Sequence, residues 1–137
     1  MWSSHKLRVF IFYAGRSMNA ATAPRQWLIS PDTAGIGLLS FLQAITVLDT
    51  ACVFLVAAGR RARYVHLLLV LATVYIIFHL YNQRTLLARG QWRAIRQEFG
   101  SIDANDRCFS GVCILLVEMI GFAAFAYMGS ILDHIPP

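Results

Sequence analysis

The chain has 137 residues, of which 58% are hydrophobic and 14% charged, and its formal net charge is +5. Soluble domains carry about 25% charged residues, so this composition excludes an ordinary water-soluble domain and indicates an integral membrane protein. About half of the chain lies in long apolar stretches, which leaves no room for a separate soluble domain. We therefore expect one small all-α membrane protein.

The amino-terminal arm, residues 1–34, is basic. Its first 31 residues contain four basic side chains and no acid, together with several serines, which is typical of an organellar import sequence. A basic extension that binds a partner protein explains the same composition equally well. The apolar run at residues 7–13 is too short to span a membrane, and we expect it to lie at the membrane surface or against a partner.

Three apolar stretches follow the arm, at residues 35–58, 64–81 and 109–132. A helix rises 1.5 Å per residue, so each stretch is about long enough to cross roughly 30 Å of hydrocarbon. The sequence therefore predicts a unit of three transmembrane helices over residues 35–132, followed by a short tail at residues 133–137.

The first span carries a polar stripe. Four polar side chains recur at helical spacing and share one side of the helix: Gln43, Thr46, Asp49 and Thr50. Polar residues within a span almost always face protein or water, and an ionised carboxylate against lipid costs a few kcal/mol. We expect the stripe to contact another helix, with Asp49 either protonated or paired.

The second span contains two histidines, His66 near its start and His79 near its end. In a helix they lie about 20 Å apart along the axis and roughly 140° apart around it, so they cannot bind one ion together. Each is able to serve as an axial ligand of a haem b whose second histidine comes from another subunit. We favour ordinary packed or interfacial histidines, with no cofactor and no metal site.

The connector between the second and third spans has the pattern of an amphipathic helix over residues 85–99. Arg89, Arg93 and Arg96 form one stripe, and a neighbouring apolar stripe includes Trp92 and Phe99. We predict that this helix lies on the membrane, with the apolar edge in the acyl boundary and the arginines on anionic lipids such as cardiolipin. Docking on the acidic surface of a partner is the alternative.

The third span carries a second carboxylate, Glu118, about ten residues from its start. Gly121 lies close by on the same side of the helix, and a small residue there lets another helix approach closely. We therefore expect Glu118, like the stripe of the first span, to form polar contacts between helices. If Asp49 and Glu118 met each other, one of them would have to hold a proton.

The basic residues also predict an orientation. Nine lie in the arm and the connector, whereas the loop between the first two spans holds three, Arg60, Arg61 and Arg63. The positive-inside rule then places the amino terminus inside. The three loop arginines all lie next to membrane ends, where they count most, and oppose this orientation.

No nucleophile–base pair, phosphate-binding loop or metal-ligand set accompanies these polar residues, so the sequence predicts no catalytic residues and no nucleic-acid partner. We expect a non-catalytic accessory subunit of a multi-subunit membrane complex, whose partners are other membrane-protein subunits and anionic lipids. The import-like arm favours the mitochondrial inner membrane and a respiratory-chain or ATP synthase assembly, with a bacterial inner membrane as the alternative.

Two other functions stay open. The first is a membrane anchor of a redox complex at a haem b or quinone site, using His66 or His79. The second is a component of a proton pathway built on Asp49 and Glu118.

Overall fold

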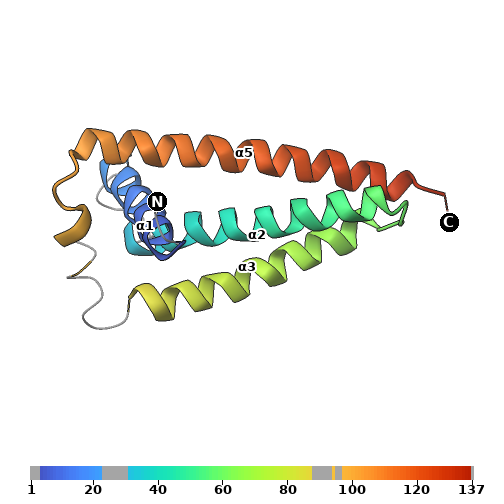
Figure 1. Cartoon of the computed structure of the whole chain (residues 1–137), viewed down its shortest axis with the longest axis horizontal. Coiled ribbons are helices and arrows are strands. Elements are labelled where there is room, and N and C mark those ends of the chain that lie inside the picture. Colours follow the sequence, from blue (N-terminus) through green and yellow to red (C-terminus); the bar gives the residue numbers. More distant parts are fainter. Residues whose placement is uncertain (1–3, 23–30, 88–93, 95–96, 137) are drawn as a thin grey trace.

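The structure is a computed structural model, and it describes residues 4–22, 31–87, 94 and 97–136. This described part is helical and contains no strand (Figure 1). The helices with defined bounds are α1 (Ser4–Thr22), α2 (Pro31–Ala57), α3 (Tyr64–Leu86) and α5 (Ala104–His134). Positions 94 and 97–99 are helical as well.

Three long helices, α2, α3 and α5, form the body of the molecule. α2 and α5 run in the same direction along the long axis, and α3 returns antiparallel to them (Figure 1). Each is long and apolar enough to cross a membrane, over Asp32–Ala57, Tyr64–Leu86 and Asn105–His134. The prediction of an all-α, multi-pass integral membrane protein is therefore confirmed. The helices extend past the apolar stretches because flanking polar residues continue the same backbone hydrogen bonding.

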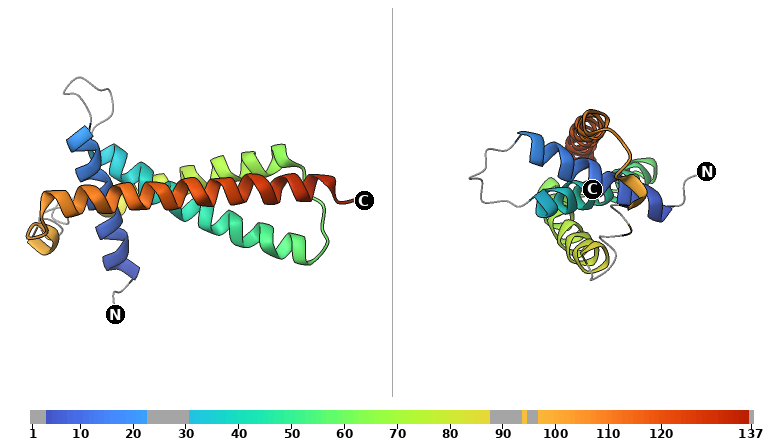
Figure 2. Two further views of the ribbon diagram at one scale, coloured as in Figure 1. Left: turned by 90° about the horizontal axis from the view of Figure 1, so that it is seen from above. Right: turned by 90° about the vertical axis from the view of Figure 1, so that its left-hand side faces the viewer.

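The helix α1 lies across the end of this bundle where α2 and α5 begin (Figure 2). The predicted apolar run is part of α1, and its side chains from Val9 to Tyr13 are buried or half-buried within the chain, whereas Leu7 is exposed. Phe12 is fully buried, in a cluster with Val9, Ile36 and Leu39. The apolar spacing of Val9, Phe12 and Tyr13 gives α1 one buried face.

Two glycines bring α1 and α2 into close contact. A Cβ atom added to Gly35 would lie 2.5 Å from the carbonyl oxygen of Phe12, and one added to Gly15 would lie 2.8 Å from Leu38 Cδ2. The backbones of the two helices therefore touch at their crossing. Small residues permit such an approach in membrane proteins, where close packing replaces the hydrophobic drive for association.

The other end of the bundle is closed by a short turn and by side-chain packing. Gly59 adopts a left-handed conformation with φ 61° just after α2, which ends the helix and starts the reversal into α3. Beyond the turn, the ring of Tyr64 packs against Phe125 and over Gly129. A second apolar cluster, which includes Ile45, Leu48 and Phe125, continues from here along the interior.

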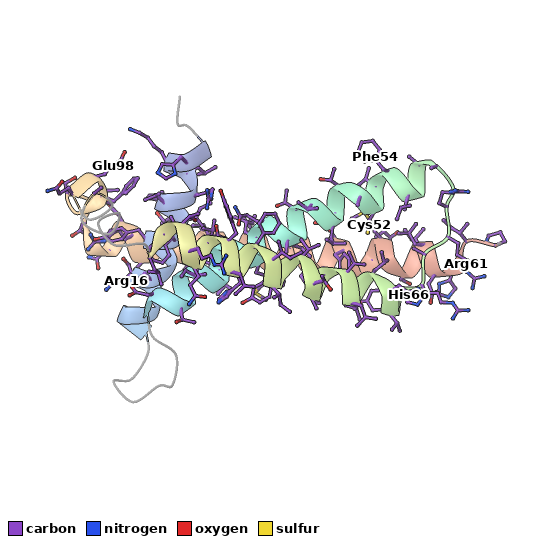
Figure 3. The ribbon with its side chains drawn as sticks, turned by 90° about the horizontal axis from the view of Figure 1, so that it is seen from below. Arg16, Cys52, Phe54, Arg61, His66 and Glu98 are labelled. Atoms are coloured by element: carbon purple, nitrogen blue, oxygen red, sulfur yellow. The ribbon has the colours of Figure 1, made fainter. Side chains whose placement is uncertain are left out.

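Much of the outer surface of the bundle is apolar. In the most apolar 18-residue segment of each helix, only 11% of α3 and 17% of α5 is buried within the chain. Phe54, which is 71% exposed, points away from the bundle (Figure 3). Such a surface needs lipid or other membrane helices around it.

Candidate functional site

A polar network at the α1 end of the bundle centres on Asn82 of α3. Its amide nitrogen donates to Ser40 Oγ at 3.0 Å and to Gln43 Oε1 at 2.7 Å, both on α2. Its amide oxygen accepts a hydrogen bond of 2.8 Å from the guanidinium of Arg8 on α1. Asn82 and Ser40 are both fully buried. One amide therefore joins three helices.

Arg8 extends the network toward the end of α3. The same guanidinium nitrogen lies 3.2 Å from Thr85 Oγ1, and the guanidinium carbon lies 5.0 Å from the centre of the Tyr81 ring. The cation is thus held by hydrogen bonds on one side and by an aromatic face on another. Its Nε is shielded from solvent and has no hydrogen-bond partner within the described part of the chain.

Other charged residues fasten α1 to its surroundings. Arg107 of α5 donates to Tyr13 Oη at 3.0 Å and lies 4.9 Å above the centre of the Tyr13 ring. Arg16 pairs with Asp32 at the start of α2, and Lys6 Nζ lies 3.0 Å from Glu98 Oε1. Arg16 and Glu98 both lie at the α1 end of the molecule (Figure 3). Both ion pairs are at least partly exposed to solvent, so each is worth at most about 1 kcal/mol.

The structure divides the polar stripe predicted for the first span. Gln43 belongs to the Asn82 network. Thr46 and Thr50 are exposed, and their hydroxyls donate to carbonyls of α2 itself, at Leu42 (2.7 Å) and Thr46 (2.8 Å). Contact of these two threonines with a helix of another protein stays a prediction.

Both predicted carboxylates lie at the interface of α2 and α5. Glu118 is 4% exposed and lies against the backbone of Leu42. Asp49 Oδ2 lies 3.6 Å from the position that a Cβ atom of Gly121 would occupy, so α2 is the helix that approaches this glycine. Asp49 Oδ1 and Glu118 Oε1 are shielded from solvent, and neither has a hydrogen-bond partner among the described residues. The two carboxylates share an interface without pairing through these oxygens.

A groove opens at the surface beside Glu118. It has a volume of about 400 Å³ and is lined by Phe41 of α2 and by Leu115, Glu118, Met119 and Phe122 of α5. The rings of Phe41 and Phe122 pack with their centres 6.2 Å apart. Glu118 is the one ionisable residue among these lining residues.

The structure keeps the two histidines of α3 apart. His66 is exposed beside the loop arginines, and it lies near Arg61 at the end opposite Arg16 (Figure 3). His79 is half-buried, with its ring centre 5.6 Å from that of Tyr75, and its Nδ1 has no hydrogen-bond partner in the part of the chain that the structure describes. Within the described ranges, no group of three or more histidine, cysteine or acidic side chains is placed to hold a metal ion. Haem ligation with a histidine from another subunit stays a prediction.

The connector differs from its predicted packing at Phe99. This side chain is 5% exposed and packs against Phe10 and Tyr13 of α1, with ring centres 5.8 and 6.4 Å apart. The expectation that Phe99 sinks into the acyl boundary is therefore wrong, because α1 covers it. Arg89, Arg93 and Arg96, the predicted lipid ligands, lie outside the described residues.

The Asn82 network itself was not expected from the sequence, apart from Gln43. A partial signal was present, because Ser40 and Gln43 lie three residues apart on α2 and therefore on one face. Asn82 directly follows the apolar stretch that ends at residue 81, where a polar residue is ordinarily taken as the start of a loop. Arg8 lies in the arm and has no periodic relation to either.

No protein-family model matches the chain, and no curated protein and no solved structure is similar to it at a significant level.

Proposed function

We propose that this chain is a non-catalytic structural subunit of a multi-subunit membrane complex. The observation that carries the proposal is the pair of carboxylates at the α2–α5 interface, each with one shielded oxygen that has no hydrogen-bond partner among the described residues. A polar group without a hydrogen bond costs several kcal/mol in hydrocarbon. A neighbouring membrane protein that supplies hydrogen-bond donors to these carboxyl groups lowers this cost. The large apolar surface of α3 and α5 offers area for such a neighbour.

The use of the other polar groups supports the same function. Asn82, Ser40 and Gln43 hydrogen-bond across helices, and Arg107 binds Tyr13. These contacts hold α1, α2, α3 and α5 in one arrangement. The amides and hydroxyls involved therefore have a structural function rather than a catalytic one. A rigid helical unit with apolar outer faces is what an accessory subunit needs in order to pack between larger partners.

For the parent complex, we favour a respiratory-chain or ATP synthase assembly of the mitochondrial inner membrane, with the amino terminus inside. The acid-free, basic first 31 residues support this compartment. Arg89, Arg93 and Arg96 then bind anionic phospholipid, for which cardiolipin is the natural candidate in that membrane.

The test is the size and composition of the particle that contains the chain. The full-length protein, with a small carboxyl-terminal tag, is extracted from its native membrane in a mild detergent and analysed by native electrophoresis and mass spectrometry. We expect a particle far larger than the 15.3 kDa chain, containing other membrane proteins at fixed ratios.

Extraction in a harsh detergent is the control and should release the single chain. A chain that runs alone in mild detergent would overturn the proposal.

A proton pathway is the second candidate, because Asp49 and Glu118 line the same helix interface. The substitutions Asp49→Asn and Glu118→Gln keep the size of each side chain and remove its titrating proton. Weakened assembly with unchanged proton transport supports the structural function. Lost transport in an intact complex supports the pathway.

A further inference from the structure

The α5 residues that line the groove beside Glu118 are spaced like those of a helix-docking surface. Leu115, Glu118, Met119 and Phe122 lie within an arc of about 100° around α5, at the i, i+3, i+4 and i+7 positions that form the contact seam between packed helices. Leu115, Met119 and Phe122 are all exposed. Their side chains are therefore available to a helix that runs alongside α5.

Glu118 adds a need for a hydrogen-bond donor to this otherwise apolar seam. It lies about 20 Å along the axis from Asn105 and about 24 Å from His134, so it is near the middle of the span and distant from both membrane surfaces. Its side chain is more than nine-tenths buried in the groove wall, and its Oε1 has no hydrogen-bond partner within the described ranges of the chain. A carboxyl oxygen at this depth needs a hydrogen-bond donor that is itself inside the bilayer.

We propose that this groove binds a transmembrane helix of another membrane protein, which places a side-chain hydrogen-bond donor against the carboxyl group of Glu118. The inference rests on the proposed function and adds the docking surface and the chemistry of the partner. A lipid tail fills an apolar groove but offers no donor. In a symmetric pair of this chain, Glu118 would face a second carboxyl, and the exposed side chains beside it on α5, Leu116, Val117 and Ile120, also lack a donor.

The first experiment maps what touches the groove. A photo-reactive amino acid replaces Met119 in the full-length chain in its native membrane, and the same amino acid replaces Ile120 in the control. Met119 and Ile120 are 62% and 70% exposed, but Ile120 lies about 160° around the helix from Glu118. We expect position 119 to cross-link to a membrane-spanning segment that carries a polar or basic donor within one turn of the attachment point. Position 120 should give no adduct with that segment.

The second experiment tests the donor. Glu118→Gln keeps an acceptor oxygen, whereas Glu118→Leu removes it. We therefore expect Glu118→Leu to lower the amount of the cross-linked partner per chain by roughly tenfold or more. Glu118→Gln should lower that amount only slightly. Met119→Trp obstructs the groove and leaves Glu118 in place, with Ile120→Trp as its control. We expect at least a fivefold loss for Met119→Trp and no loss for Ile120→Trp, at equal amounts of chain in the membrane.

Several outcomes would overturn the inference. They are cross-links from position 119 to lipid alone or to a second copy of this chain, equal cross-linking from positions 119 and 120, or an unchanged partner ratio in both Glu118→Leu and Met119→Trp. In each case, a chain that still runs in a large complex would leave the proposed function standing. A chain that runs alone in mild detergent would remove both.

Discussion

At the level of single residues, the described interior contains two kinds of buried polar group, those with hydrogen-bond partners and those without. Asn82 uses its amide nitrogen and its amide oxygen on neighbours in two other helices. Glu118 is buried to a similar degree, yet no described residue forms a hydrogen bond with its Oε1. Within a low-dielectric interior, the first arrangement favours one specific packing of the helices, whereas the second costs free energy.

The contribution of the Asn82 network can be measured with Asn82→Leu, which keeps the approximate size of the side chain and removes its three hydrogen bonds. Hydrogen bonds between membrane helices average about 0.6 kcal/mol each, so we expect a loss of about 2 kcal/mol in the free energy of unfolding. Reversible unfolding in mixed detergent micelles gives this value. Thr73→Val is the control and should cost less than about 0.5 kcal/mol, because that exposed hydroxyl bonds only to its own helix at Leu69. Equal losses would contradict the network.

The crossing of α1 and α2 depends on Gly35. In Gly35→Ala the new methyl group meets backbone atoms, the Phe12 carbonyl oxygen at 2.5 Å and the Arg16 nitrogen at 3.1 Å, so the helices must separate. We expect a loss of about 1–3 kcal/mol in unfolding free energy. Gly121→Ala is the matched control, because its nearest neighbour, Ile45 Cγ2, lies at an ordinary contact distance of 3.4 Å. A tolerated Gly35→Ala would show that α1 crosses α2 at a greater separation.

At the level of elements, the sequence predicted the spans well and α1 poorly. A span is recognised from the hydropathy of its own residues, so α2, α3 and α5 were predictable. The docking of α1 depends on partners far along the chain, such as Asn82, which is 74 residues from Arg8. The amphipathic pattern of the connector shows that an apolar edge must be covered, but it does not show whether lipid or α1 covers Phe99.

The contact between Arg107 and Tyr13 holds α1 against α5. Arg107→Gln removes a charged hydrogen bond and a cation–π contact, so we expect local opening of α1 to become about 1–2 kcal/mol easier. Backbone hydrogen exchange over 9–17 should then become about 5–30 times faster, with little change over 112–130. Arg84→Gln, at an exposed position near the end of α3, is the control. Unchanged exchange in both variants would mean that Arg107 does not hold α1.

At the level of the whole molecule, side-chain contacts join the helices at both ends of the bundle, and a groove lies between these ends. The Arg8–Asn82 contacts join the helices at one end, and the packing of Tyr64 on Phe125 and Gly129 joins them at the other. Between these ends, Glu118 opens on a groove at the surface. The sequence predicted both carboxylates as contact residues because a charge within a span is a local signal. The groove depends on how α2 and α5 pack, which the sequence does not reveal.

The chain also offers two clusters of three arginines that test how it sits in the bilayer. One is Arg89, Arg93 and Arg96 in the connector, and the other is Arg60, Arg61 and Arg63 in the exposed loop between α2 and α3. A basic residue near an anionic leaflet contributes about 1 kcal/mol, so replacing the three connector arginines by glutamine should weaken binding of anionic phospholipid by roughly a hundredfold. The measurement is the mass-spectrometric ratio of anionic to zwitterionic phospholipid that co-purifies with each variant. The loop triple variant should retain the wild-type ratio if the amino-terminal side faces the anionic leaflet. Loss of anionic lipid from the loop variant alone would reverse both the orientation and the assignment of the lipid site.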